Sequence, residues 1–373
     1  MKFTINREEF LKGLQTAGHA ISPKSSAPVL MQFKLDLTPR GLEIVASNNE
    51  ISIWTLVPMN NGTNETIRNA SFGSTLLNAY ILTEIVRKIG SKEITVEVID
   101  NTIAKIDDGK TAFKLNCISA DQYPDIELAE NAEAFELKCT DLIRLVEQTS
   151  FAALTKETRP ILTGINLKAD GGKLTATATD SARLSRKTVE VDPTLKFGCN
   201  IPSKVLVDLT HMLEGYDVVR VSPNKDKMIF AFGTTLYSSC LIGGDYPIAS
   251  QIIPNTFNYY LEINADEFIR SVERVSILNV DRAPVVKLSM SEDSVEVSSR
   301  SDQMGSGNER LGTFQYTGER LEIAFNSQFV LDAVKAVRGE DVLLSFIGEM
   351  KPFVVKNPKD DSIIELVTPM RTR

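Results

Sequence analysis

The chain has 373 residues, of which 42% are hydrophobic and 24% charged, with a mean hydropathy of -0.07. This composition excludes a disordered chain, and the length allows two or three domains with sizeable cores. The formal net charge of -8 and the pI of about 5.1 argue, taken alone, against a nucleic-acid partner.

The sequence offers little material for a secretory, membrane-bound or metal-dependent protein. The amino-terminal segment lacks the apolar core of a signal peptide, and no apolar run is long enough to span a membrane. Only two histidines are present, His19 and His211, and they leave little material for a histidine-ligated metal site or a histidine-based catalytic triad. We therefore expect a soluble, cytoplasmic protein without a metal or cofactor.

The four cysteines are widely spaced and form no CxxC pair. This spacing predicts buried, reduced thiols rather than a disulfide framework or a zinc site. They are Cys117, Cys139, Cys199 and Cys240.

An amphipathic helix is predicted near the start of each third of the chain, at residues 7–14, 140–146 and 265–272. Phe10, Leu142 and Phe268 hold equivalent apolar positions, at spacings of 132 and 126 residues. This recurrence indicates a repeated structural unit.

Strands are predicted after each of these helices. A proline, Pro28, Pro160 or Pro284, opens a run of alternating residues that is typical of a strand. A turn and a second alternating run follow at 41–45, 172–176 and 293–297, so each copy is expected to contain a hairpin.

A second helix is predicted in each copy, at residues 79–90, 203–215 and 326–339. Each ends in a glycine, Gly90, Gly215 or Gly339, and we expect these glycines to adopt the left-handed conformation that terminates helices. Further strands are predicted beyond the helices, for example at 93–98 and 342–346.

The repeat is about 125 residues long, which is the size of a small domain and longer than a solenoid repeat. The predicted fold class is therefore α+β, with three similar domains in tandem at 1–128, 129–256 and 257–373. Short linkers are expected near 129–134 and 254–258.

Basic residues recur at equivalent positions of the three copies. One set lies two residues after each apolar anchor, on the helix face that points away from the packed side, and another lies twelve residues further on. The six helical segments, taken with their flanks, hold 12 basic and 11 acidic residues, against 29 and 38 elsewhere. A solvated helix face is the ordinary interpretation, but the distribution also suits helices that face phosphate. The two sets are Lys12, Arg144 and Arg270, and Lys24, Lys156 and Arg282.

Several short motifs occur in the order expected of a known family. They lie at residues 159–164 (RPILTG), 178–184 (ATDSARL), 245–247 (DYP), 325–326 (FN) and 351–353 (KPF), between an MKFTI start and an LVTPMR end. Together with the repeat, they resemble the bacterial DNA polymerase III β subunits, the sliding clamps. The likeness runs from the first residue to the last.

This resemblance implies a DNA polymerase processivity factor and not an enzyme. Two copies would associate head to tail into a six-domain ring, with helices around duplex DNA of any sequence and sheets outside. Phe113 and Leu115 of one copy would contact Ile277 and Leu278 of the other. The DNA-binding residues would be Lys12, Lys24, Arg144, Lys156, Arg159, Lys204, Arg270 and Arg282.

The resemblance also implies a pocket between the second and third domains that binds short motifs of the polymerase III α subunit, the clamp loader and other clamp-binding proteins. An apolar trough with a few polar side chains suits peptide anchors of this kind. Its residues would be Leu162, Thr179, Ser181, Arg183, Leu184, Pro247, Ile252, Asn326, Phe329, Met350, Val367, Thr368, Pro369, Met370 and Arg371.

Three positions near this pocket depart from the family pattern. Ala182 replaces a common histidine, Ile248 a common aspartate, and Gln251 a frequent arginine. These differences leave open a divergent or second-copy clamp with restricted partners, or a ring-shaped scaffold that is not loaded on DNA. A carboxylate-dependent hydrolase is a further alternative, which the repeat disfavours because no copy is chemically distinctive.

Overall fold

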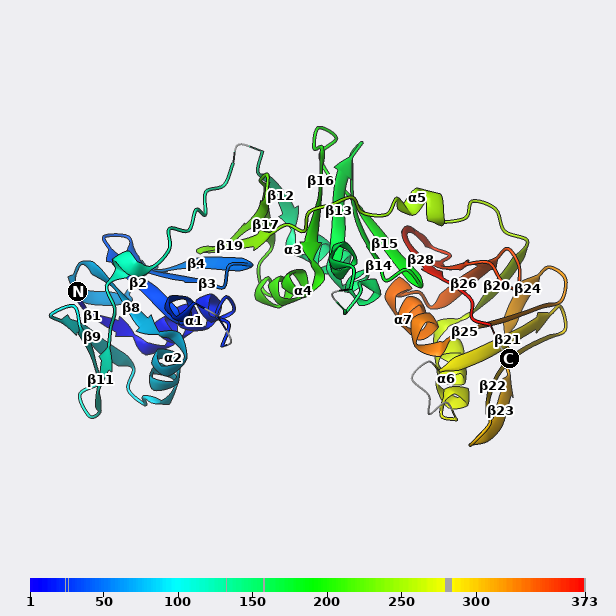
Figure 1. Cartoon of the computed structure of the whole chain (residues 1–373), viewed down its shortest axis with the longest axis horizontal. Helices are drawn as coiled ribbons and strands as arrows, with labels where there is room; N and C mark the ends of the chain where they lie inside the picture. Colours follow the sequence, from blue (N-terminus) through cyan, green and yellow to red (C-terminus); the bar gives the residue numbers. More distant parts are fainter. Residues whose placement is uncertain (24, 26, 132, 157, 279–283, 372–373) are drawn as a thin grey trace. The chain divides into compact units, whose positions relative to one another are not determined.

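The computed structural model describes residues 1–23, 25, 27–131, 133–156, 158–278 and 284–371. The chain folds into two compact units, each formed from two separate stretches of sequence. Unit 1 combines Met1–Cys139 with Asp208–Leu241, and unit 2 combines Thr140–Val207 with Ile242–Arg373. In each unit, helices pack against antiparallel sheets (Figure 1).

Unit 1 contains a five-stranded sheet in the order β11-β10-β9-β1-β7 and an eight-stranded sheet in the order β12-β17-β18-β19-β4-β3-β2-β8. A small ribbon, β5-β6, is separate. The helices are α1 (Arg7–Gly18), α2 (Ala79–Lys88) and the 3-10 turns η1 (Pro28–Met31) and η2 (Ala120–Gln122). The strands are β1 (Lys2–Asn6), β2 (Gln32–Thr38), β3 (Gly41–Ser47), β4 (Ile51–Pro58), β5 (Asn60–Asn61), β6 (Asn64–Glu65), β7 (Ile67–Ser71), β8 (Gly73–Asn78), β9 (Glu93–Ile99), β10 (Ile103–Asp107), β11 (Ala112–Asn116), β12 (Phe135–Lys138), β17 (Val218–Pro223), β18 (Lys227–Phe232) and β19 (Thr235–Cys240).

Helix α1 shows how the sequence specifies these elements locally. The Asn6 side chain caps the helix by accepting hydrogen bonds from the backbone N–H groups of Glu8 and Glu9. Phe10 and Leu14 are buried one turn apart on the face that packs on β3 and β4. Gly13 allows this close approach, since a Cβ atom there would lie 2.7 Å from Val57 Cγ2.

Unit 2 contains a nine-stranded sheet in the order β16-β13-β14-β15-β28-β27-β26-β20-β24 and a four-stranded sheet in the order β23-β22-β21-β25. Helices α3 and α4 each have residues in both units. The helices are α3 (Cys139–Glu147), η3 (Ser150–Ala152), η4 (Pro160–Thr163), α4 (Ser203–Met212), α5 (Ala249–Ile252), α6 (Ala265–Ser276) and α7 (Ser327–Val337). The strands are β13 (Gly164–Asp170), β14 (Lys173–Thr179), β15 (Arg183–Glu190), β16 (Phe197–Pro202), β20 (Tyr259–Asn264), β21 (Val285–Ser291), β22 (Ser294–Ser301), β23 (Gly305–Arg310), β24 (Phe314–Thr317), β25 (Leu321–Asn326), β26 (Asp341–Phe346), β27 (Phe353–Asn357) and β28 (Asp360–Val367).

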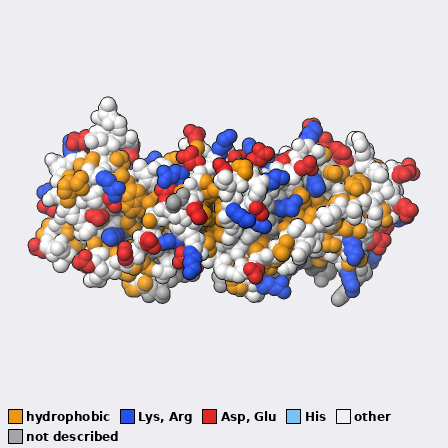
Figure 2. Space-filling view, turned by 90° about the horizontal axis from the view of Figure 1, so that it is seen from above, with side chains coloured by type: hydrophobic (Ala, Val, Ile, Leu, Met, Phe, Trp, Pro, Cys, Tyr) orange, Lys and Arg blue, Asp and Glu red, His pale blue; other side chains and the backbone are white. Residues whose placement is uncertain are grey.

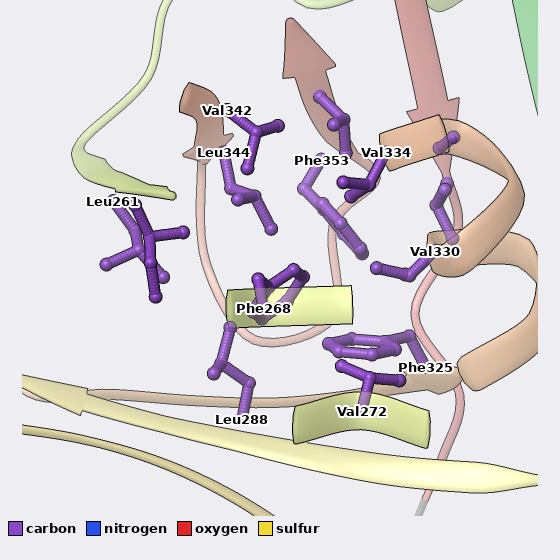
Figure 3. Close-up of a cluster of buried hydrophobic side chains, with 14 of the residues drawn as sticks. Leu261, Phe268, Val272, Leu288, Phe325, Val330, Val334, Val342, Leu344 and Phe353 are labelled. Carbon is purple, nitrogen blue, oxygen red and sulfur yellow. The ribbon is translucent and has the colours of Figure 1, made fainter. Parts of the chain in front are cut away.

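The main core of unit 2 lies between α6, α7 and the two sheets (Figure 3). Phe268 and Val272 of α6 point toward Phe325 of β25 and Phe353 of β27. The rings of Phe325 and Phe353 lie 5.7 Å apart between centroids. This packing holds α6 and α7 against β25 and β27.

The threefold repeat is visible in the order of the strands. Each copy has a first meander (β2-β3-β4, β13-β14-β15 or β21-β22-β23) and a second meander (β9-β10-β11, β17-β18-β19 or β26-β27-β28). The two meanders of the middle copy belong to different units, because β19 pairs with β4 and β15 pairs with β28. The predicted α+β repeat is therefore confirmed.

Some local predictions were wrong. Pro28 and Pro160 open 3-10 turns before the strands, because proline fixes a turn-compatible φ and has no N–H for a strand ladder. Among the three predicted capping glycines, only Gly215 has a positive φ, of 86°. Helix α7 instead ends with Arg338 in the left-handed conformation.

The four thiols are free, as expected, but only three are buried. Cys240 is exposed at the end of β19, where its thiol lies 3.2 Å from the backbone oxygen of Asn49. The expectation of buried thiols was therefore wrong for Cys240.

The core predicts a large difference between two phenylalanine truncations. Phe268→Ala should lower the free energy of unfolding by about 3–5 kcal/mol, because it removes a fully buried ring. The matched control, Phe72→Ala, removes an exposed ring and should change it by less than about 0.5 kcal/mol. Urea unfolding followed by circular dichroism measures both, and similar losses would contradict the core assignment.

Candidate functional site

The candidate site of unit 2 is built on the antiparallel seam between β15 and β28. Arg183 lies opposite Val367, and the register continues to Lys187 opposite Ile363. Because side chains alternate along a strand, Arg183 and Ser185 share the face that carries α7, and Leu184 lies on the other face. The seam thus presents a polar face and an apolar face.

On the polar face, Arg183 is fully engaged within the protein. Its Nε donates to Asp180 Oδ2 at 3.0 Å, and its Nη1 donates to Asp332 Oδ2 on α7 at 2.6 Å. Its Nη2 donates to the backbone oxygen of Phe151, and the guanidinium lies 4.5 Å from the Phe329 ring centroid. Arg183 therefore positions α7 against β15 and has little capacity left for a ligand.

The turn before β15 is held in one conformation. Thr179 Oγ1 donates to the backbone oxygen of Arg183 at 2.6 Å and accepts from the backbone N–H of Ser181. Ser181 has a φ of 79°, which the surrounding hydrogen bonds sustain. The hydroxyl of Tyr246 accepts from the N–H of Thr179 at 3.0 Å, so the segment that follows β19 is tied to this turn.

On the apolar face, Leu184 packs with Ile364 and Leu366 of β28. Ala249 of α5 and Ile253 cover this cluster, and Figure 1 shows α5 and α7 on opposite sides of β28. Seen from the side that carries α5, hydrophobic side chains lie among interspersed acidic and basic ones (Figure 2). Leu184 is therefore beneath a cover and not at an open surface.

The carboxyl-terminal segment is tied down at both of its edges. The backbone N–H and the hydroxyl of Thr368 donate to the backbone oxygen of Ala182, at 2.9 and 2.8 Å. The N–H of Met370 donates to the backbone oxygen of Ala324 on β25 at 2.7 Å. Residues 368–370 thus extend from the seam to the four-stranded sheet.

A cavity of about 360 Å³ opens beside this segment. Met350, Met370 and Arg371 line it together with Ala324. The ion pair between Lys287 and Glu322 forms its polar side. It offers thioether and alkyl surface next to opposite charges, which suits an amphipathic peptide.

The structure brings most predicted pocket residues to the seam, the α7 start or the terminal segment, but at different depths. Leu162, Thr179, Leu184 and Val367 are buried. Asn326 is half-buried, and its side chain caps α7 by accepting from the N–H groups of Gln328 and Phe329. The others are half-buried, namely Arg183, Phe329, Thr368, Pro369 and Met370, or exposed, namely Ser181, Pro247, Ile252, Met350 and Arg371.

Sequence reasoning missed Asp180 and Asp332, the carboxylate partners of Arg183, and Phe151, whose backbone oxygen accepts from it. Asp332 and Phe151 gave no local signal, since they are 149 and 32 residues from Arg183, whereas Asp180 lies only three residues before it, inside the motif at 178–184. Glu365 was also missed, although an acidic residue inside the apolar run of residues 363–367 marks it as unusual.

The predicted basic residues that the structure describes are exposed. Lys12, Arg144, Lys204 and Arg270 lie on α1, α3, α4 and α6, and Lys156 and Arg159 lie in the loop after η3. Arg270 pairs with Asp266 at 3.8 Å, and Arg159 Nη1 donates to Ser181 Oγ at 3.3 Å. Lys24 and Arg282 lie outside the described residues.

The predicted dimer residues lie at two strand edges. Phe113 and Leu115 are on β11, an edge of the five-stranded sheet. Leu278 packs beneath Gly307 of β23, an edge of the four-stranded sheet, and Ile277 is 75% exposed.

Comparison with known proteins agrees with this architecture. Models for the DNA polymerase III beta subunit match along the chain, the N-terminal domain at residues 1–127, the central domain at 136–248 and the C-terminal domain at 250–371. The threefold fold and these three family matches together define the class of protein, which is a clamp of three similar domains.

Individual relatives agree over their whole length. The beta sliding clamp of Bacillus subtilis is 34% identical over 378 residues, and that of Halalkalibacterium halodurans is 32% identical, each with all of both chains covered. The crystal structure of the B. subtilis DNA polymerase sliding clamp superposes with a TM-score of 0.97, and the beta chain from Streptococcus pneumoniae with 0.95, at 33% and 30% identity over all of both chains.

The chain belongs to the DNA polymerase III beta subunit family, the beta sliding clamps, and its role is that of a DNA polymerase processivity factor. The predicted family and fold class are confirmed. In the part of the chain that the structure describes, no helix could span a membrane, and no group of three or more His, Cys, Asp or Glu side chains could hold a metal ion.

Glu365 is a fully buried acidic residue at the seam. The positions of its hydrogen-bonding neighbours indicate whether it is protonated. The Ser185 hydroxyl lies 2.6 Å from the Gln148 backbone oxygen and 2.7 Å from Glu365 Oε1. One hydroxyl has one proton and the backbone oxygen can only accept, so a protonated Glu365 satisfies both contacts. Burial raises the pKa of Glu365 well above its usual value, although the charge of Arg183, and a hydrogen bond that Ser185 could donate to the carboxylate, favour the ionised form.

This raised pKa predicts a pH-dependent loss of stability. Stability due to Glu365 is complete below the unfolded-state pKa near 4.5 and falls as pH rises toward the folded-state pKa, by up to about 1.4 kcal/mol per pH unit. Glu365→Gln should unfold at nearly the same urea concentration as the parent at pH 4.5 and at a higher concentration at pH 7 and 8. Parallel pH profiles for the two proteins would show that Glu365 is ionised in the folded state.

Proposed function

We propose that two copies of this chain associate head to tail into a ring around duplex DNA and tether the polymerase to it. The observation that carries the ring is a pairing rule between repeats. In both units, the last strand of a first meander pairs with the last strand of a second meander, β4 with β19 and β15 with β28. By this rule β23 and β11 are the remaining complementary edges, and each is unpaired on its outer side within the described part of the chain.

Exposed apolar side chains accompany these two edges. Near β23, Ile277 is 75% and Met304 56% exposed, and near β11, Phe113 is 36% exposed. Long unpaired edges and apolar patches are normally covered in a stable protein. Pairing of β23 of one copy with β11 of the other covers both, and two such contacts close a ring.

Helix α2 supports the same contact. Asn78 and Asn326 cap α2 and α7 in the same way, so Ile81 of α2 is equivalent to Phe329 of α7. Phe329 is covered by Arg183 of the neighbouring repeat, whereas Ile81 is 45% exposed. A groove of about 940 Å³ beside Ile81, lined mainly by α1 and α2, offers space for the second copy.

The domain limits follow from this assembly. We place them at 1–128, 129–256 and 257–373, so that each domain contains one first and one second meander. With these limits each repeat is one domain. The pairings of β4 with β19 and of β15 with β28 are then contacts between neighbouring domains.

The ring predicts that the dimer depends on Ile277 and Leu278. The double variant Ile277→Ala, Leu278→Ala should be monomeric at submicromolar concentration, because each burial at the interface contributes about 2–5 kcal/mol. Light scattering measures the mass, about twice 41.2 kDa for the parent dimer. The control Ile248→Ala, at an exposed position outside both edge strands, should stay dimeric, and a dimeric double variant would refute the contact.

DNA contact is assigned to the exposed basic residues of the helices, Lys12, Arg144, Lys204 and Arg270, with Lys156, Arg159, Lys24 and Arg282. Their repetition places positive charge at several points around the duplex. Weak phosphate contacts suit a ring that slides, because they carry no sequence information.

Charge reversal tests this assignment. The triple variant Lys12→Glu, Arg144→Glu, Arg270→Glu should lose retention on nicked circular DNA after clamp loading and should remain a folded dimer, because all three residues are exposed. A control with the same charge change, Lys168→Glu, Lys173→Glu, Arg320→Glu, alters exposed residues of strands or their ends and should be retained. Equal retention of both variants would exclude the helical faces.

Peptide motifs of the polymerase III α subunit, the clamp loader and other clamp-binding proteins are assigned to the seam and terminal segment of unit 2. The fixed turn at 179–183 and the cavity beside Met370 support this site. Ala182 lies at its centre, since its backbone oxygen accepts from Thr368. Ala182 is smaller than the histidine common in the family, and Gln251 lacks the charge of the frequent arginine. Both differences favour a narrower set of partner peptides.

Deletion of residues 368–373 should abolish peptide binding and leave the ring dimer intact. The deletion removes Pro369 and Met370, and loss of anchors worth about 2 kcal/mol each weakens binding at least about thirtyfold. The restored variant Ala182→His, Gln251→Arg should instead bind a consensus clamp-binding peptide more tightly than the parent. Fluorescence anisotropy with labelled peptide measures all three, and equal affinities would place the pocket elsewhere.

A further inference from the structure

A second cavity, of about 300 Å³, lies in unit 1 where the segment 123–128 crosses the eight-stranded sheet. Its floor is one row of side chains in register across four strands. Lys34 of β2 lies opposite Val45 of β3, and Val45 lies opposite Trp54 of β4. Trp54 in turn lies opposite Leu236 of β19, so the floor spans the β4–β19 seam.

This seam is the repeat counterpart of the one between β15 and β28. The pair Tyr123-Pro124, which covers the cavity, recurs as Tyr246-Pro247 in unit 2. The hydroxyl of Tyr246 accepts a hydrogen bond from the backbone of Thr179, whereas the buried hydroxyl of Tyr123, nearest the backbone of Ser47 at the end of the equivalent strand β3, has no hydrogen-bond partner among the described residues. Burial raises the pKa of Tyr123 to about 12, so its hydroxyl is neutral.

The cavity differs from the unit 2 site in its charge and in its aromatic floor. The Arg40 guanidinium lies 5.9 Å from the centroid of the Trp54 ring and donates to Glu43 Oε1 at 2.8 Å. Glu43 Oε2 accepts from Trp54 Nε1 at 2.9 Å, which fixes the indole. Although burial opposes ionisation, the hydrogen bonds from Trp54 and Arg40 lower the pKa of Glu43, so it stays charged.

Lys34 supplies the second cation of the cavity. Among the carboxylates that the structure describes, none lies within 4.0 Å of its ammonium, although the charge of Asp36 on the same strand interacts with it, and the single carboxylate that lines the cavity, Asp125, is exposed on the covering segment. Lys34 and Arg40 therefore border an indole, an aliphatic floor and a proline ring. This arrangement is complementary to a carboxylate next to an apolar side chain.

We propose that this cavity binds a short acidic peptide segment. One apolar side chain lies on Trp54 and Leu236, and an adjacent carboxylate lies between Lys34 and Arg40. The volume of the cavity suits one or two side chains, so the affinity for the peptide segment is modest. The cavity would act as a second point of attachment for a partner protein that is also bound elsewhere. The inference rests on the cavity and the repeat, and not on the peptide site proposed for unit 2.

Trp54 is the only tryptophan of the chain, so its fluorescence reports directly on this cavity. The full-length protein is titrated with acetyl-Glu-Leu-Phe-amide and, separately, with acetyl-Gln-Leu-Phe-amide. The acidic peptide should change the Trp54 emission saturably, and the neutral one should bind about fivefold or more weakly. Equal binding of both peptides, or no change at millimolar peptide, overturns the proposal.

Matched variants locate the signal. Lys34→Gln and Arg40→Gln should each weaken the acidic peptide about fivefold or more, whereas Lys92→Gln, an exposed lysine of unit 1 away from the cavity, should not. The variant that lacks residues 368–373 should keep the Trp54 response even though the unit 2 site is removed. A response that the deletion abolishes and Lys34→Gln leaves unchanged would assign the peptide to unit 2 and overturn this site.

Discussion

Backbone hydrogen bonds between strands of different repeats are the constraint on which the rest of this structure depends. A strand at the edge of a sheet presents unpaired N–H and C=O groups, and each repeat has such edges at the ends of its two meanders. Within the chain, β4–β19 and β15–β28 satisfy two pairs of edges and convert separate sheets into continuous ones. The same need at β11 and β23 is the physical basis of the dimer that we propose.

The seam between β15 and β28 also gives a physical basis for the peptide site that we propose there. Arg183, Asp180 and Asp332 hold α7 and the turn before β15 in fixed positions, so nearby side chains are ordered before a peptide arrives. Pre-ordering of this kind lowers the entropic cost of binding. Arg183 thus supports the peptide site that we propose for unit 2.

Charge distribution reconciles an acidic protein with a DNA partner. The net charge of -8 belongs to the whole chain, whereas phosphate is attracted by the local field of the nearest side chains. Exposed Lys12, Arg144 and Arg270 recur at one position of the first helix in each repeat. The ring that we propose needs only such weak, distributed attraction, because its closure around the duplex would prevent escape.

The sequence by itself determined the threefold repeat, the α+β class and the family, because periodic apolar positions such as Phe10, Leu142 and Phe268 depend on local spacing. It also placed most helices to within a few residues, and asparagines such as Asn78 and Asn326 mark helix starts by local hydrogen bonding. Only the tertiary structure decided the pairing of β15 with β28, the partners of Arg183 and the cavity at Trp54. These join residues up to about 190 positions apart, and no local pattern encodes which distant edge a strand will meet.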